Sequence, residues 1–290
     1  MKTRGLGRGQ VIAILYLDIG DNALPVLHVV ILSLIQGITE FLPISSQAHL
    51  QILSMFSGWA DQGLMIDVAV HVGTLGAVIV YFWRDLLSMT QGCIKLTKGE
   101  LSSDARLAGF LIIGTLPAVA AGYLLNKHYP NGIRSIEIIG WTTLGFGLLL
   151  YLADKTGMTL RSIKHIKLSD IIIIGCAQAI ALIPGTSRSG ITMTAARILG
   201  MERNESARLS MLLSIPVIIG AGTLKGWELY KIGDISLNND VYLAASIAFI
   251  AALIVMAGLM AWLKRATYTP FVIYRIILGG FLLSIVYGWV

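Results

Sequence analysis

The sequence predicts an all-α integral membrane protein with an inverted-topology repeat, made of about six transmembrane helices plus re-entrant or broken helices. Composition is the first reason: 56% of the 290 residues are hydrophobic, only 13% are charged, and the mean hydropathy is +0.77. A soluble domain carries about twice that charged fraction. The second reason is a series of long apolar runs. The third is a pair of proline-containing polar breaks at similar places in the two halves.

We expect an N-terminal extension at residues 1–26 and a single membrane domain at residues 27–290, with repeats at about 27–153 and 169–290. The extension begins with basic residues followed by an apolar run. Its acidic residues and the lack of a small-residue cleavage site favour a retained amphipathic or uncleaved segment over a signal peptide.

Six apolar runs are long enough to cross a bilayer, because about 20 helical residues span the hydrocarbon. They are residues 66–83, 107–125, 136–152, 209–224, 241–263 and 271–290. Proline, glycine and polar residues interrupt three further runs, at 24–35, at 41–56, and at 171–183 continuing to 199. We interpret these three as half-membrane or re-entrant helices.

Lysine and arginine gather in alternate loops, which the positive-inside rule places in the cytoplasm. The rich loops hold Arg84, Lys95, Lys98 and Arg106, then Lys155, Arg161, Lys164 and Lys167, then Lys264 and Arg265. The carboxyl terminus then lies outside. These loops explain most of the net charge of +6, and with no soluble basic domain we expect no nucleic-acid partner. Cys93 and Cys176 support neither a disulfide framework nor a zinc site.

The internal repeat rests on the order and spacing of the hydropathy pattern. Pro43 and Pro184 lie 141 residues apart (184 − 43), and the same offset places Ser46 on Ser187. If each half has a broken helix and three crossings, the second half enters the membrane upside down. In that plan the broken helices meet near the midplane of the bilayer.

The first break, at residues 36–49, places polar groups inside apolar sequence, where such groups are costly and usually functional. They are the carboxylate of Glu40, the hydroxyls of Ser45 and Ser46, and the imidazole of His49. Pro43 lies among them and removes a backbone donor, so it breaks or kinks the helix. A broken helix with polar groups at membrane depth is a candidate site.

The second break, at residues 181–190, has the features of an anion-binding loop. Gly185 and Gly190 relax the backbone, so that N–H groups near Thr186, Ser187 and Ser189 can converge on an anion. A helix beginning after Gly190 adds its N-terminal dipole, and the planar fork of Arg188 suits two phosphate oxygens. The alternative is a membrane-surface loop with an incidental arginine.

Together the two breaks offer the parts that phosphoryl transfer needs: charge neutralisation, a nucleophile and a proton acceptor. We assign phosphate binding to Ser45, Gly185, Thr186, Ser187, Arg188 and Ser189. Ser46 can attack or orient water, and Glu40 or His49 can take the proton. Glu40 can instead bind a divalent cation together with Gln36, four residues earlier on the same helical face. Both alternatives stay open.

Two further pairs are polar residues in apolar runs. Asp67 and His71 share a helical face and are candidates to support the site from behind, with a helix-packing hydrogen bond as the alternative. We interpret Tyr274 and Arg275, near the start of the last run, as interfacial anchors.

The runs Gln-Gly-Ile-Thr-Glu-Phe-Leu-Pro-Ile-Ser-Ser at 36–46 and Pro-Gly-Thr-Ser-Arg-Ser-Gly at 184–190 resemble the two motifs of the bacitracin-resistance type undecaprenyl-diphosphate phosphatases. The likeness extends from about Leu27 to the carboxyl end. It implies a catalytic core of Glu40, Ser46, His49 and Arg188, with Gln36 at the first acidic position of the motif. The chain departs from the family pattern at residues 47–48, where Gln-Ala replaces the usual Thr-Gly.

The resemblance implies a phosphatase of undecaprenyl diphosphate that recycles the lipid carrier for cell-wall synthesis and confers bacitracin resistance. It implies a multi-pass protein of the bacterial plasma (inner) membrane, a site open to the extracytoplasmic side, and a divalent metal, Mg or Ca. The expected partners are the polyprenyl diphosphate and membrane lipids, with a homodimer left open. The alternative function is a transporter or flippase of a lipid phosphate, which the inverted repeat suggests independently.

Overall fold

The computed structural model describes residues 26–57, 59, 63–128, 135–157, 159–232 and 238–289. The N-terminal extension expected at 1–26 therefore lies, except for Val26, outside the described residues. Every named element in the described part is a helix, which confirms the all-α prediction.

Six long helices correspond to the six predicted crossings, and each is long and apolar enough to span a membrane. They are α4 (Gly63–Tyr81), α6 (Ser103–His128), α7 (Ile136–Thr156), α10 (Arg203–Ile232), α11 (Asn239–Leu263) and α12 (Thr269–Val286). The interrupted runs form pairs of short helices: α2 (Val26–Thr39) with α3 (Ser46–Ser57), and α8 (Leu168–Ile180) with α9 (Arg188–Ile198).

The sequence does not predict helix α5 (Trp83–Leu96), which follows α4 directly. Charged residues such as Arg84, Asp85 and Lys95 interrupt its apolar sequence, so it has no membrane-length run. A three-residue helix, η1 (Ile163–His165), precedes α8.

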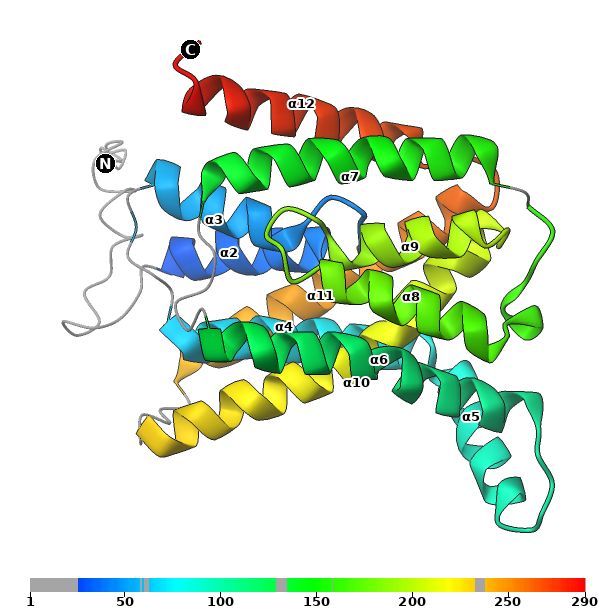
Figure 1. Ribbon diagram of the computed structural model, residues 1–290. Helices are drawn as coiled ribbons and strands as arrows, with labels where there is room; N and C mark the ends of the chain where they lie inside the picture. The colour runs from blue at the N-terminus through cyan, green and yellow to red at the C-terminus, as the bar shows by residue number, and fades with distance from the viewer. Residues whose placement is uncertain are drawn as a thin grey trace, which may run out of the picture.

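The two short-helix pairs point into the bundle from opposite ends, as the inverted repeat predicts. In Figure 1, α2 runs inward from one end and α8 from the other, and both chains turn near the middle. We call residues 40–45 the first turn and residues 181–187 the second turn. Each inward helix packs on a long helix from the other half of the chain, α2 on α11 and α8 on α6. The two halves are therefore interlocked.

Glycine allows these helices to cross closely. A Cβ atom on Gly37 would lie 2.7 Å from the carbonyl oxygen of Ala248 in α11. A Cβ atom on Gly175 of α8 would lie 2.5 Å from the carbonyl oxygen of Gly114 in α6. Neither neighbour is a flexible side chain, so a larger residue at either position would push two helices apart.

We expect Gly175→Ala to lower the thermal unfolding temperature of the purified protein in detergent, because overpacking a tight crossing costs about 1–3 kcal/mol. The matched control is Gly258→Ala in α11, where an added Cβ would meet no atom within 4 Å. That control should unfold at or slightly above the wild-type temperature. An unchanged unfolding temperature for Gly175→Ala would contradict the close crossing of α6 and α8.

The register of the repeat differs by one residue from the predicted offset of 141. Ser45 and Ser187 are the two non-glycine residues of the described chain with positive φ, both at 72°. Each precedes a short helix and accepts from the backbone N–H three residues on, Ala48 for Ser45 and Gly190 for Ser187. The structural offset is therefore 142 (187 − 45), and Ser46 corresponds to Arg188. The prolines misalign by one because the second turn is one residue longer than the first.

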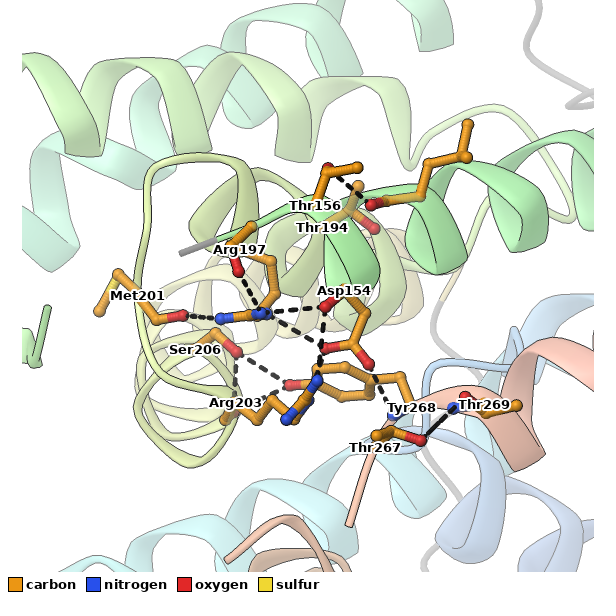
Figure 2. Close-up of polar contacts among 12 residues, drawn as sticks. Asp154, Thr156, Thr194, Arg197, Met201, Arg203, Ser206, Thr267, Tyr268 and Thr269 are labelled. Carbon is orange, nitrogen blue, oxygen red and sulfur yellow. Dashed lines mark hydrogen bonds and ion pairs between the residues drawn. The ribbon is translucent and has the colours of Figure 1, made fainter. Parts of the chain in front are cut away.

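A buried ion cluster closes one end of the bundle, where α7 and α9 end and α10 and α12 begin (Figure 2). The carboxylate of Asp154, 3% exposed, accepts from Arg197 Nε at 3.2 Å and from Arg203 Nε at 2.7 Å. It also accepts from the backbone N–H of Tyr268 at 3.2 Å. Burial raises the pKa of the Tyr268 hydroxyl, which donates to the carbonyl of Arg203 at 2.9 Å. We call this the basic end, because the lysine-rich and arginine-rich loops lie there.

Candidate active site

The two turns meet inside the bundle, as predicted. Ser189 Oγ, at the start of α9, donates to the carbonyl oxygen of Leu42 in the first turn at 2.7 Å. Arg188 Nη2 donates to Oε1 of Glu40 at 3.1 Å. Residues that are 148 positions apart in the sequence thus form one polar centre.

Glu40 is the hub of this centre. Its Oε2 accepts from Ser46 Oγ at 2.9 Å, while its Oε1 faces Arg188. The side chains of Glu40 and Arg188 are only 9% and 13% exposed. Arg188 also donates through Nη1 to the carbonyl oxygen of Ser210 in α10, which fixes the direction of its guanidinium. One carboxylate therefore holds the candidate nucleophile and the candidate phosphate ligand together.

Gln36 and His71 extend the centre toward the end opposite the basic end. Gln36 Nε2 donates to Glu40 Oε2 at 2.9 Å and lies 3.4 Å from His71 Nε2. His71 Nδ1 lies 2.7 Å from the carbonyl oxygen of Asp67, so Nδ1 carries the proton and Nε2 is the acceptor. A flipped amide would place its oxygen against two acceptors, and Nε2 must therefore face them. Gln36 Oε1 is left buried with no hydrogen-bond partner.

The side chain of Asp67 forms an ion pair with Lys225 of α10 at 3.3 Å. Nothing in the sequence marks Lys225, because one lysine near the end of an apolar run is ordinary for a membrane helix. Through its backbone, Asp67 instead orients His71.

His49 lies beside this centre, and the structure describes no hydrogen bond between it and Ser46 or Glu40. Its Nδ1 donates to the carbonyl oxygen of Ser45 at 2.7 Å, so its Nε2 accepts from the hydroxyl of Tyr274 at 2.5 Å. This geometry makes Glu40, rather than His49, the immediate proton acceptor for Ser46.

The prediction of an interfacial anchor is wrong for Arg275, which is fully buried, and stays a prediction for Tyr274, which is 41% exposed. Tyr274 contacts His49, and Arg275 donates to backbone carbonyls of both turns. Aromatic and basic residues at the end of an apolar run usually mark the interface, and for Arg275 that rule misled. Both residues could have been assigned to the site from the sequence, because they lie in the part of the chain that resembles the family.

Of the residues predicted to bind phosphate, Ser45 lies in the first turn, and the others lie in the second turn and at the start of α9. Ser187 Oγ lies 3.1 Å from Ser189 Oγ, and Thr186 Oγ1 is buried without a hydrogen-bond partner. Gly185 has φ of +87°, and a Cβ there would lie 2.2 Å from Thr142 Oγ1, so both conformation and space require glycine.

The arrangement suits an anion with a transferable group. Helices α3 and α9 both begin at the centre, so their partly positive N-terminal ends converge from opposite sides. Arg188 adds a full positive charge. Ser46, whose proton points at a carboxylate, is placed as a nucleophile or as a group that orients water.

Comparison with known proteins gives one consistent result. The family model described as "Bacitracin resistance protein BacA" matches residues 29–281. A protein named "Undecaprenyl-diphosphatase 1" from Rhodospirillum rubrum is 51% identical over 269 residues, covering 90% of this chain and 95% of the relative. "Undecaprenyl-diphosphatase" proteins from Hahella chejuensis and Ruegeria pomeroyi are 50% and 49% identical, each covering 90% of this chain and 98% of the relative. On this similarity, which includes both turns and all the helices around them, the chain belongs to the bacitracin resistance protein BacA family.

Proposed function

We propose that this protein hydrolyses undecaprenyl diphosphate to undecaprenyl phosphate and inorganic phosphate, recycling the lipid carrier for cell-wall synthesis and conferring bacitracin resistance. Family membership and the names of the relatives support the substrate. The observation that carries the chemistry is the Glu40 carboxylate, which touches both Ser46 and Arg188. A carrier needs an anion site but no hydroxyl poised against a base, so this contact favours hydrolysis over transport.

In the proposed reaction, Ser46 Oγ gives its proton to Glu40 and attacks the terminal phosphorus. The bond from that phosphorus to the bridging oxygen breaks, and the lipid monophosphate leaves with the proton that Glu40 had taken up. Water then gives a proton to Glu40 and attacks the phosphoserine, and Glu40 returns that proton to Ser46 Oγ as inorganic phosphate leaves. Arg188 and the N-terminal ends of α3 and α9 stabilise the charge on the transferring group. His49, held between the Ser45 carbonyl and the Tyr274 hydroxyl, orients the start of α3, which carries Ser46.

A divalent cation, Mg²⁺ or Ca²⁺, would be held by Glu40 and Gln36 once the Gln36 amide turns over, so that Oε1 replaces Nε2 beside the carboxylate. Gln36 Oε1 is a buried oxygen without a partner, on the amide whose nitrogen contacts Glu40. The described residues contain no cluster of three His, Cys, Asp or Glu side chains. Two protein oxygens completed by phosphate oxygens and water are typical of a Mg²⁺ site. A bound cation would neutralise charge on the diphosphate.

We propose that the protein lies in the bacterial inner membrane with its site open to the extracytoplasmic side. The positive-inside rule assigns the basic end to the cytoplasm. The buried Asp154 cluster fills that end, whereas the polar series from Glu40 through Gln36 and His71 leads away from it. The diphosphate then enters sideways from the outer part of the bilayer.

The direct test is phosphate release from undecaprenyl diphosphate by the purified protein in detergent. We expect turnover with added Mg²⁺ or Ca²⁺, a loss of at least about tenfold after chelation, and recovery when the cation is returned, since metal neutralisation of a phosphoryl group contributes several kcal/mol. No phosphate release under any of these conditions would contradict the phosphatase. Full activity after exhaustive chelation would instead contradict only the metal.

A further inference from the structure

Arg275 of α12 is fully buried, and backbone carbonyl oxygens take up all of its hydrogen-bonding capacity. A guanidinium has five N–H donors. Nε donates to Thr143, Nη1 to Pro43 and Thr186, and Nη2 to Thr142 and Gly185, at distances of 2.9–3.3 Å. All five acceptors are main-chain carbonyl oxygens.

Three of these carbonyls belong to the two turns, and the other two, of Thr142 and Thr143, belong to α7. Pro43 lies in the first turn, just before Ser46, and Gly185 and Thr186 lie in the second turn, just before Arg188. Turn carbonyls buried away from water need donors, and here neither turn can supply them from its own helices. The Arg275 side chain therefore binds both turns at once, in addition to the Ser189–Leu42 and Arg188–Glu40 hydrogen bonds.

The positive charge of Arg275 has no carboxylate partner. Among the described residues, Arg275 forms no ion pair, whereas Arg188 is paired with Glu40. Carbonyl dipoles stabilise the buried cation without cancelling its charge. Counting Glu40, Arg188 and Arg275, the centre carries one net positive charge before any anion binds. In a low-dielectric interior such a charge acts over several ångströms.

Two glycines provide the space for this side chain. A Cβ on Gly190, the last residue of the Arg-Ser-Gly sequence in α9, would lie 3.0 Å from Arg275 Nη1. A Cβ on Gly147 of α7 would lie 2.9 Å from Arg275 Cβ. The chain thus leaves room for Arg275 on both sides.

We propose that Arg275 is a positioning residue that sets the distance between Ser46 and Arg188 and supplies the uncompensated positive charge that draws the diphosphate into the site without touching it. The inference rests on the proposed phosphatase function. Arg275 thus has two roles, holding the two turns at a fixed distance and supplying positive charge, and different substitutions remove each role.

The first experiment compares Arg275→Lys with Arg275→Gln in the full-length protein in detergent. Turnover is measured by phosphate release, and binding by calorimetry with methylenediphosphonate, a diphosphate analogue that cannot be hydrolysed. Both variants should lose at least about tenfold in kcat, because both lose carbonyl contacts that place the turns. Lysine keeps the charge and should bind the analogue within about threefold of wild type, whereas glutamine should bind it about tenfold or more weakly. Arg265→Gln, an exposed arginine at the basic end, is the control and should match wild type.

Equal analogue affinity for the lysine and glutamine variants would overturn the charge role, and wild-type kcat in both would overturn the spacing role. If the wild-type protein binds the analogue but releases no phosphate, the proposed function fails while the binding comparison still tests Arg275.

A second pair of variants tests spacing without altering Arg275 itself. Gly147→Ala pushes a Cβ against Arg275, whereas Gly145→Ala on the same helix meets no atom within 4 Å. We expect Gly147→Ala to lower kcat by about tenfold when assayed well below its unfolding temperature, since small misplacements at a reacting centre cost about that much or more. Overpacking should also make it unfold below Gly145→Ala. Gly145→Ala should keep the wild-type rate. Equal kcat for the two variants would contradict the spacing role even if the Arg275 variants fail to fold.

Discussion

Replacing Arg188 with alanine is expected to lower kcat/KM for phosphate release by roughly 10³-fold or more, because an arginine that neutralises a transferring phosphoryl group contributes about 10³–10⁵. The structure adds a second cost. Arg188 is the ion-pair partner of Glu40, so its loss leaves a nearly buried carboxylate uncompensated and favours its protonated form. A protonated Glu40 cannot accept the Ser46 proton. Steady-state phosphate release by the purified variant measures the combined effect.

The control for this variant is Arg84→Ala, an exposed arginine at the start of α5, which should keep the wild-type rate. Arg188→Lys is informative as a partial replacement. It retains a charge but cannot bridge both the Glu40 carboxylate and the Ser210 carbonyl in the same geometry. If Arg188→Ala retained more than about a tenth of wild-type kcat/KM, Arg188 would not be the phosphate ligand.

Ser46→Ala should lower kcat by about 10⁴-fold or more if the hydroxyl is the nucleophile, as for other enzymes that lose a covalent nucleophile. If Ser46 only orients water, the loss should be nearer about 10²-fold. The hydrogen bond from Ser46 Oγ to Glu40 at 2.9 Å supports the larger effect. The rate of phosphate release, followed over hours to capture slow turnover, distinguishes the two.

Ser54→Ala is the matched control, because Ser54 lies on the same helix and its hydroxyl donates only to the carbonyl of Leu50. Its kcat should equal that of wild type. Wild-type turnover by Ser46→Ala would remove the nucleophile from the mechanism and would revive the carrier interpretation. Trapping of ³²P on wild-type protein, and not on Ser46→Ala, would identify the covalent step directly.

The hydropathy pattern predicted the membrane fold well and its finer detail less well. All six crossings were recognisable because each is a long, nearly uncharged run, and the breaks were recognisable from proline and glycine. Helix α5 was not predicted because its apolar residues form one face of the helix and alternate in the sequence with charged residues. The offset of the repeat was wrong by one because the alignment used prolines, whereas the backbone aligns the two capping serines.

The candidate site was predictable where its chemistry lies in charged or hydroxyl side chains close together in sequence. Glu40, Ser46 and Arg188 were named from their motifs, and the structure places them in contact. Arg275 was not identified as part of the site because its partners are backbone carbonyls, which every residue possesses and no motif marks. The contact of Tyr274 with His49 likewise depends on how α12 packs beside α3.

The Asp154 cluster has a consequence for the symmetry of the molecule. The two halves of an inverted repeat are related by a pseudo-two-fold axis in the membrane plane. The ion pairs at the two ends do not share this symmetry, because Asp154 is buried with Arg197 and Arg203, whereas Asp67 and Lys225 at the far end are partly exposed. Breaking a buried pair by removing one partner costs about 3–5 kcal/mol, far more than loss of an exposed pair. The repeat is therefore symmetric in topology, but one of its ends is held together much more strongly than the other.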